Sequence, residues 1–270
     1  MDLISIARVN EISQRKGIPV KEVELESLRE NIIPARYLRN IGIYGVQGQI
    51  KLLESTVAVV GSGGLGGWII EILARTGIGK LIVIDGDTFE ETNLNRQLLL
   101  TEKQLGYPKV EAAKERIKDI NSAVEVETHY LEIDLYHNPV EAIIKGADVV
   151  VDALDGLEIR LILQEAAEKL NIPCVHGAAG GTSVQVTTIF PGDKSLEKIY
   201  GPAGDLVNQG IEETLGTPSP VPALCASWQA QEVTKYLTGK GELLRNKLLF
   251  MDASFLEIEI IDLGNNTHNY

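Results

Sequence analysis

The sequence predicts an α/β protein with a Rossmann-like, doubly wound and mainly parallel sheet, antiparallel C-terminal strands and a helical N-terminal segment. Three observations lead to this prediction. Short apolar runs alternate with helical patterns between residues 56 and 176, at the spacing of βαβ units. A glycine-rich turn joins the first of these runs to a helical pattern. From residue 183 onward, strand patterns predominate.

The N-terminal part, residues 1–55, has a mostly helical pattern. Pro19 and Pro34 divide it into short pieces, because proline breaks a helix interior. At Thr56–Val60 the pattern changes to a β-branched, apolar run that ends at Gly61 and predicts a buried strand.

The rest of the chain continues the alternation. Helices are expected at residues 68–75, 110–120, 140–145, 157–170 and 223–237, and strands at 81–84, 124–127, 149–151, 173–176, 184–190, 248–251 and 255–261. Residues 192–220 are rich in Gly, Pro, Asp and Ser and predict a long loop. Loops of that length are more often functional or mobile than inert.

Composition and charge restrict the class of protein. The hydrophobic content of 44% and the charged content of 23% are typical of soluble globular proteins. No apolar run reaches the roughly 18 residues of a membrane span, and the N-terminus lacks the features of a signal peptide, so a cytoplasmic protein is expected. The net charge of −13 argues against nucleic acid binding. The two cysteines, Cys174 and Cys225, cannot form a four-cysteine zinc site, and both are expected to be buried.

The strongest motif is the run from Gly61 to Gly67, which follows a predicted strand and opens a predicted helix. Gly61, Gly63 and Gly66 have G-x-G-x-x-G spacing, which lets the backbone turn tightly and approach a phosphate at a helix N-terminus. Asp85 lies 24 residues after Gly61, at the end of the next strand, where an acid can bind ribose hydroxyls. The motif predicts a nucleotide but does not separate NAD from ATP.

The following segment favours ATP. Arg96 and Asn93 come just after the second strand, and Lys109 follows a Gly-Tyr-Pro turn. Two cations and an amide at this edge suit a triphosphate, because they offset the charge that develops at the α-phosphorus. The alternative is that Arg96 and Lys109 are ordinary surface charges.

A carboxylate completes the predicted site. Asp155 lies beyond the C-terminal end of the strand at 149–151, where it can hold Mg²⁺ against phosphate oxygens. Capping the helix that starts at Leu157 is a second, compatible role. Asp152 is nearer the sheet and is interpreted as structural.

Taken together, these motifs resemble the ThiF/MoeB/HesA family of ATP-dependent carrier-protein adenylyltransferases, which is related to the ubiquitin-activating enzymes. The resemblance runs from about residue 35 to about residue 263. It is carried by the glycine run, by Asp85 with the segment 92–97, by the Gly-Tyr-Pro-Lys at 106–109, and by Asp155 with Arg160.

The resemblance implies a role for each matching residue. The catalytic candidates are Asp155, also the Mg²⁺ ligand, with Arg96, Lys109 and Arg39; the nucleotide-binding candidates are Gly61, Gly63, Gly64, Gly66, Asp85, Asp87, Asn93 and Gln97. Arg39 lies in Arg-Tyr-Leu-Arg-Asn at 36–40, which is similar to the Arg-Tyr-x-Arg-Gln segment of the family. The resemblance implies that Arg39 reaches the triphosphate bound by the other subunit of a homodimer.

The resemblance also implies a domain plan and a reaction. We expect a helical extension over residues 1–35 and an adenylation domain over 36–270. Its nucleotide-binding half covers about 55–180 and its carrier-binding half about 181–270. The implied cofactors are ATP and Mg²⁺, and the implied partner is a small ubiquitin-like sulfur carrier with a C-terminal Gly-Gly tail.

Departures from the family pattern accompany these expectations. Many relatives bind zinc through two Cys-x-x-Cys pairs and carry a cysteine in the crossing loop; this chain has neither, so no zinc is expected. Gly156 stands where the family commonly has Asn after the metal-binding acid.

Two other functions remain open at this stage. A related branch of the family dehydrates a modified adenosine, threonylcarbamoyladenosine, of tRNA with a similar ATP site. The segment 93–97 fits that branch equally well, although the acidic net charge does not. An NAD-linked oxidoreductase would explain the glycines and Asp85 but not Arg96, Lys109 and Asp155.

Overall fold

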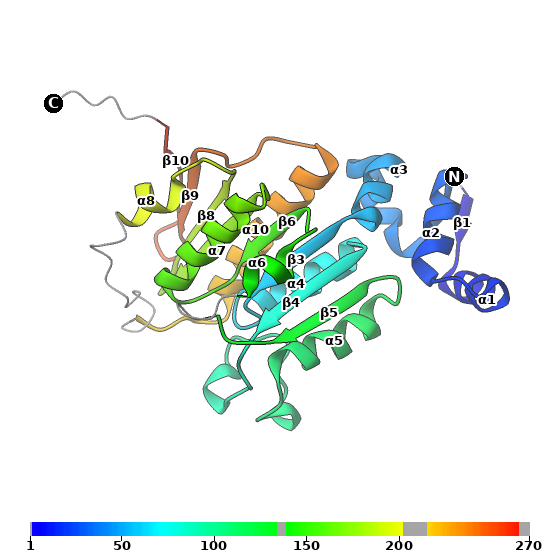
Figure 1. Ribbon diagram of the computed structural model, residues 1–270, viewed down its shortest axis with the longest axis horizontal. Coiled ribbons are helices and arrows are strands. Elements are labelled where there is room, and N and C mark those ends of the chain that lie inside the picture. Colours follow the sequence, from blue (N-terminus) through cyan, green and yellow to red (C-terminus); the bar gives the residue numbers. More distant parts are fainter. Residues whose placement is uncertain (1, 134–138, 202–214, 265–270) are drawn as a thin grey trace.

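The computed structural model describes residues 2–133, 139–201 and 215–264. Its centre is an eight-stranded sheet (Figure 1). The strands are β3 (Thr56–Val60), β4 (Lys80–Asp85), β5 (Glu125–Tyr130), β6 (Val149–Asp152), β7 (Cys174–Gly180), β8 (Ser183–Ile189), β9 (Lys247–Asp252) and β10 (Glu257–Asp262).

The spatial order of this sheet is β10-β9-β8-β7-β6-β3-β4-β5. The five strands from β3 to β7 are mutually parallel, and β8, β9 and β10 continue the sheet in antiparallel fashion. The predicted fold class is therefore confirmed. The strands also begin and end within a few residues of the predicted positions.

Helices cover both faces of the sheet. One face carries α4 (Gly66–Thr76), α5 (Lys109–Ile120) and α10 (Pro220–Thr238), and the other carries α6 (Val140–Ile144), α7 (Leu157–Lys169) and α8 (Ser195–Tyr200). Strand β3 shows why both faces are apolar: Val57 and Val59 pack in the first layer, whereas Ala58 and Val60 pack in the second. A strand buried on both sides has no polar face, which explains the continuous apolar run in the sequence.

The N-terminal part forms its own group of elements to one side of the sheet (Figure 1). It consists of β1 (Asp2–Ile4), α1 (Ile6–Lys16), α2 (Val20–Arg29), β2 (Ile32–Pro34), the 3-10 helix η1 (Ala35–Tyr37) and α3 (Leu38–Glu54). The helices agree with the prediction. The two short strands, which pair in parallel, were not predicted, because three residues are too few to show a strand period.

A buried polar cluster fastens this N-terminal group to the main domain. Glu24 of α2 is fully buried and accepts a hydrogen bond of 3.0 Å from Tyr37 Oη. Asn121, at the end of α5, donates to Tyr37 Oη at 2.9 Å, and Arg36 forms an ion pair of 3.2 Å with Glu24. Since Arg36 and Tyr37 directly precede α3, the extension holds the start of the helix that carries Arg39.

The predicted loop at 192–220 is partly wrong. Its first part contains α8, and α10 begins at Pro220, three residues earlier than expected. The six-residue α8 is short and rich in charged residues, so its apolar face, which includes the buried Leu196, is not evident in the sequence. Residues 202–214 of that predicted loop lie outside the described part of the chain. No helix within the described ranges is long and apolar enough to span a membrane.

Candidate active site

Most of the predicted site residues converge on one cavity of about 700 Å³. It lies where β3 and β6 are neighbours but their following connections lead to opposite faces of the sheet. Crevices at such a point are the usual ligand sites of open α/β sheets. Nine predicted residues line the cavity: Gly61, Gly63, Gly64, Asp85, Asp87, Arg96, Gln97, Lys109 and Asp155.

The glycine turn between β3 and α4 serves two separate needs. Gly61 has a φ of +93°, and a Cβ there would lie 2.5 Å from the carbonyl oxygen of Ala153. A Cβ on Gly66 would lie 1.8 Å from the carbonyl oxygen of Gly61, so Gly66 is required for packing within the turn and does not line the cavity. A Cβ on Gly63 would meet nothing closer than 3.4 Å, which leaves room beside the backbone for a ligand.

This difference gives a prediction that separates packing from binding. Gly66→Ala is expected to destabilise the protein by about 3 kcal/mol, because backbone atoms must move. Gly63→Ala is expected to keep the unfolding temperature but to weaken ATP binding by about tenfold, because its methyl group takes the space of a phosphate. Thermal denaturation and ATP titration of both variants test this. Equal stability of the two variants would contradict the packing role of Gly66.

Asp85 fastens the glycine turn to the end of β4. Its carboxylate accepts hydrogen bonds from the backbone N–H of Ser62 at 2.6 Å and of Asp87 at 2.8 Å. These bonds hold the acid at the cavity wall. An ionised carboxylate has further lone pairs, so the two bonds leave acceptor capacity for ribose hydroxyls.

Lys109, at the start of α5, is not a solvated surface charge. Lys109 is only 6% exposed, and its Nζ forms an ion pair of 2.6 Å with Asp87 Oδ2. Because both side chains line the cavity, Asp87 orients the ammonium group toward it. This decides against the alternative interpretation of Lys109 as an ordinary surface residue.

The segment after η2 (Glu91–Asn93) brings Arg96 and Gln97 to the glycine turn. Arg96 donates to the carbonyl oxygen of Thr92 at 2.9 Å and lies beside Gly64. Gln97 is buried, and within the described residues its Oε1 has no hydrogen-bond partner. Asn93 does not line the cavity; its side chain accepts a bond of 3.1 Å from the Glu90 backbone and fixes the turn that carries the other two.

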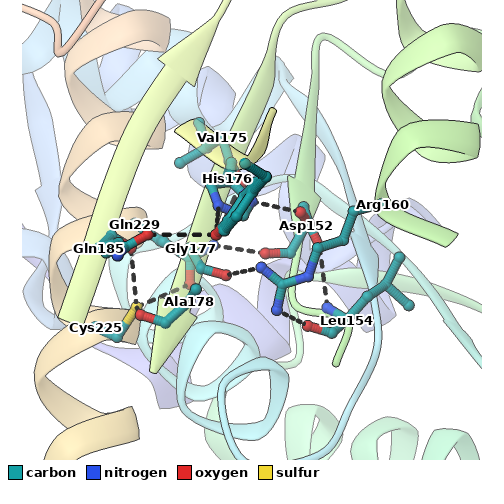
Figure 2. A network of polar contacts seen from close by, with 11 residues as sticks. Asp152, Leu154, Arg160, Val175, His176, Gly177, Ala178, Gln185, Cys225 and Gln229 are labelled. Carbon is teal, nitrogen blue, oxygen red and sulfur yellow. Dashed lines mark hydrogen bonds and ion pairs between the residues drawn. The ribbon is translucent and has the colours of Figure 1, made fainter. Parts of the chain in front are cut away.

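Asp155 lies in the loop between β6 and α7, with its side chain exposed at the cavity wall. The N-cap residue of α7 is Gly156, with no side-chain cap, so the capping role considered for Asp155 is not observed. Arg160 holds this loop in place by donating to the carbonyl oxygen of Leu154 and, at 3.1 Å, to that of Gly177 on β7 (Figure 2).

The structure adds a buried chain of polar groups that the sequence does not reveal. His176 Nδ1 is 2.7 Å from Asp152 Oδ2, and His176 Nε2 is 3.0 Å from Tyr200 Oη. Asp152 and His176 are register partners on adjacent strands (Figure 2). Tyr200 is the last residue of α8. Tyr200 reaches the cavity wall. Asp152 is thus structural, as interpreted, but it supports a residue of the cavity.

Other cavity residues were also missed. One group follows β5 and consists of Leu131, Glu132 and Ile133. The other group falls within residues 181–270, the carrier-binding half proposed from the sequence, and consists of Ser183, Gln185, Thr217 and Pro222. Strand β8 had one usable signal, since Ser183, Gln185 and Thr187 alternate with valines. Arg39, by contrast, is exposed on α3 and does not line the cavity of its own chain.

Comparison with known proteins places the chain in a family. A model described as the ThiF family matches residues 37–270. The SAMP-activating enzyme E1 of Haloferax volcanii is 35% identical over 233 residues, which cover 86% of each chain. The adenylyltransferase and sulfurtransferase MOCS3-2 of Zea mays is 35% identical over 238 residues, which cover 86% of this chain and 48% of that protein. The chain therefore spans about half the length of the plant relative.

Solved structures agree with the sequence relatives. E. coli MccB with MccA-N7isoASN has a TM-score of 0.75 and 26% identity, covering 86% of this chain and 73% of that one. E. coli MccB with ATP has a TM-score of 0.71 and 25% identity, covering 86% and 74%.

Proposed function

Because the chain belongs to the ThiF family, we propose that it is an ATP-dependent adenylyltransferase that activates the C-terminal carboxylate of a small ubiquitin-like carrier protein. The names of its relatives support the enzyme class: one is a SAMP-activating E1 and another an adenylyltransferase. The observation that carries the proposal is the cavity at one edge of the sheet. Its lining combines the glycine turn with an acid suited to bind ribose hydroxyls, two cations and a second acid, which are Asp85, Arg96, Lys109 and Asp155.

The charged residues suit the transfer of a nucleotide. A carrier carboxylate oxygen attacks the α-phosphorus of ATP, the bond to the bridging oxygen of the β-phosphate breaks, and pyrophosphate leaves with the electron pair. Arg96 and Lys109 stabilise the negative charge that develops on the phosphates. Because the carrier supplies the nucleophile, no protein nucleophile is needed, and Cys174 and Cys225 are both buried.

Mg²⁺ would bind to Asp155 together with the phosphates of ATP. The described residues contain no group of three or more His, Cys, Asp or Glu side chains that could hold a metal by themselves. Mg²⁺ commonly binds through one or two carboxylates together with substrate phosphates, which is the donor set that Asp155 and ATP would form. The metal would supply neutralising charge on the phosphates.

The exposed position of Arg39 supports the proposed homodimer. Arg39 lies on α3 beside Leu38 and near Ile43, which are 39% and 71% exposed. Arg39 does not line the cavity of its own chain, and its apolar neighbours are exposed. A surface of this kind fits one that a second subunit covers. In that arrangement Arg39 would complete the partner's triphosphate site.

ATP–pyrophosphate exchange tests the function. We expect exchange when the protein is supplied with a small ubiquitin-like carrier that ends in Gly-Gly, because only a bound carboxylate can displace pyrophosphate reversibly. The control is the same carrier with a C-terminal carboxamide, which has no carboxylate and should give no exchange. Absence of exchange across a panel of such carriers would count against the proposal, as would equal exchange with the amidated control.

A further inference from the structure

The backbone at the start of α3 decides where Arg39 can reach. Arg39 is exposed on that helix, and within the described part of the chain no hydrogen bond or ion pair holds its side chain. An arginine that serves a triphosphate bound by another subunit must nevertheless lie at a defined place. The contacts that fix the residues on either side of Arg39 therefore set the position of its guanidinium group.

A closed circuit of polar contacts holds the two residues that lead into α3. Glu24 Oε2 accepts a hydrogen bond of 3.0 Å from Tyr37 Oη, and Glu24 Oε1 forms an ion pair of 3.2 Å with Arg36 Nε. Asn121 closes the circuit, because it donates to Tyr37 Oη at 2.9 Å and accepts a bond from Arg36. Glu24 is fully buried and lies in α2, so the N-terminal extension supplies the acid on which Arg36 and Tyr37 converge.

The same circuit is joined to the two helices that begin at the nucleotide cavity. Asn121 is the C-cap residue of α5, whose first residue is Lys109, and it also donates to the carbonyl oxygen of Ala74 on α4 at 2.9 Å. Helix α4 begins at Gly66 in the glycine turn. Each chain of a symmetric dimer therefore holds Arg39 at a fixed place relative to its own cavity helices, and symmetry carries this relation to the other site.

A second set of contacts fixes the first turn of α3. Asn40 donates to the carbonyl oxygen of Thr76, at the end of α4, at 3.1 Å. A Cβ on Gly77 would lie 2.5 Å from Tyr37 Cε1, so the Tyr37 ring packs directly against the end of α4. Arg39 thus lies between anchored neighbours on both sides.

We propose that Glu24 is a positioning residue for ATP binding in the partner subunit. It fixes Arg36 and Tyr37, and through them it fixes Arg39 at the place from which Arg39 reaches the triphosphate. This inference rests on the proposed adenylation reaction and on the role of Arg39 in the partner's site. It gives residues 1–35 a function, since Glu24 lies among them and itself touches no nucleotide.

ATP and AMP, titrated without any carrier, test this role. The triphosphate is the part of ATP that Arg39 would contact, whereas AMP keeps only one phosphate. Arg39→Ala is expected to weaken ATP binding about tenfold, the effect of one lost hydrogen bond between charged groups, and to leave AMP binding unchanged. Isothermal titration calorimetry measures both affinities at protein concentrations where light scattering shows a dimer.

Glu24→Gln tests the positioning role itself. A carboxylate accepts at both oxygens and an amide at only one, so either Tyr37 or Arg36 loses its partner. ATP affinity is expected to fall about fivefold, and AMP affinity should stay unchanged. The apolar cluster between the extension and α3, which includes Leu28 and Leu53, is untouched, so the variant is expected to fold.

Glu26→Gln is the matched control. Glu26 lies on the same helix, is exposed and pairs with Lys16 outside the circuit, so its substitution should change neither affinity. Tyr37→Phe is the second variant, because it removes the hydroxyl group between Glu24 and Asn121. It should reproduce the loss that is specific to ATP, and it keeps the test decisive if Glu24→Gln does not fold.

A double-mutant cycle shows whether Glu24 acts through Arg39. If it does, the protein with both Glu24→Gln and Arg39→Ala should bind ATP as Arg39→Ala does, because no arginine remains to be misplaced. A merely structural Glu24 predicts a further loss of about fivefold in the double variant and a parallel loss of AMP affinity. Either result would overturn the positioning role, as would normal ATP binding by Glu24→Gln and Tyr37→Phe.

Failure of this inference is distinguishable from failure of the proposed function. If Arg39→Ala binds ATP as tightly as wild type, or if the protein is monomeric at every concentration, the positioning role of Glu24 is refuted while the adenylation reaction stands. If wild-type protein binds neither ATP nor AMP, the nucleotide site itself is refuted, and the proposed function and the inference fall together.

Discussion

Replacing Asp155 by alanine is expected to lower ATP–pyrophosphate exchange by a factor of about 100 or more, the size of effect seen when one electrostatic group is removed from a reacting centre. The physical reason is the loss of the carboxylate that would hold Mg²⁺ against the phosphates. The fold should be unaffected, because Asp155 is exposed and does not cap α7.

The matched control for Asp155→Ala is Glu158→Ala. Glu158 is exposed, lies three residues further along in α7 and does not line the cavity. The Glu158→Ala substitution removes a similar charge from the same surface and should leave ATP–pyrophosphate exchange unchanged. Circular dichroism and the unfolding temperature establish that both variants are folded. Near-normal exchange in a folded Asp155→Ala protein would remove Asp155 from the mechanism.

A mixture of two inactive variants is expected to recover about a quarter of the wild-type activity. Arg39→Ala and Asp155→Ala homodimers should each lose exchange by about 100-fold or more. If Arg39 acts on the partner's site, a mixed dimer has one site with both lesions and one site with neither. Random exchange of subunits makes about half of the dimers mixed, and each has one good site of two.

The controls separate this arrangement from its alternatives. Differently tagged chains must first show that subunits exchange. Arg15→Ala, at an exposed arginine of α1, is the matched charge control and should retain full activity. If Arg39 acted within its own chain, every site in a mixed dimer would keep one lesion and no activity would return. Verified heterodimers without activity would therefore exclude the trans role.

Much of the region from β3 to β7 was predictable because its signals are local. The run Thr56–Val60 is largely apolar because helices cover both faces of the parallel sheet, so that alternate residues of β3 pack in the two core layers. Gly61 and Gly66 indicate a tight turn in the sequence because neighbouring backbone atoms leave no room for a Cβ at either position. Asp85 and Asp155 could be proposed from the sequence because each lies at or beyond the C-terminal end of a predicted strand, and such positions meet at one edge of a parallel sheet.

The sequence was less informative where a role depends on residues that are distant along the chain. Asn93 was expected to contact phosphates, yet its side chain fixes a turn. Lys109 could equally have been a surface charge until its ion pair with Asp87 became visible. The strands β1 and β2 and the helix α8 are too short to produce a clear period.

The sequence by itself therefore determined the fold class, the family resemblance and the set of residues that follow the parallel strands, because periodicity and short-range spacing encode these features. Only the tertiary structure decided which of those residues share the cavity. It placed Arg39 outside that cavity and joined Asp152, His176 and Tyr200 from three elements. The physical reason is that hydrogen bonds across 24 residues depend on strand register and helix packing, and neither leaves a pattern in the neighbouring sequence.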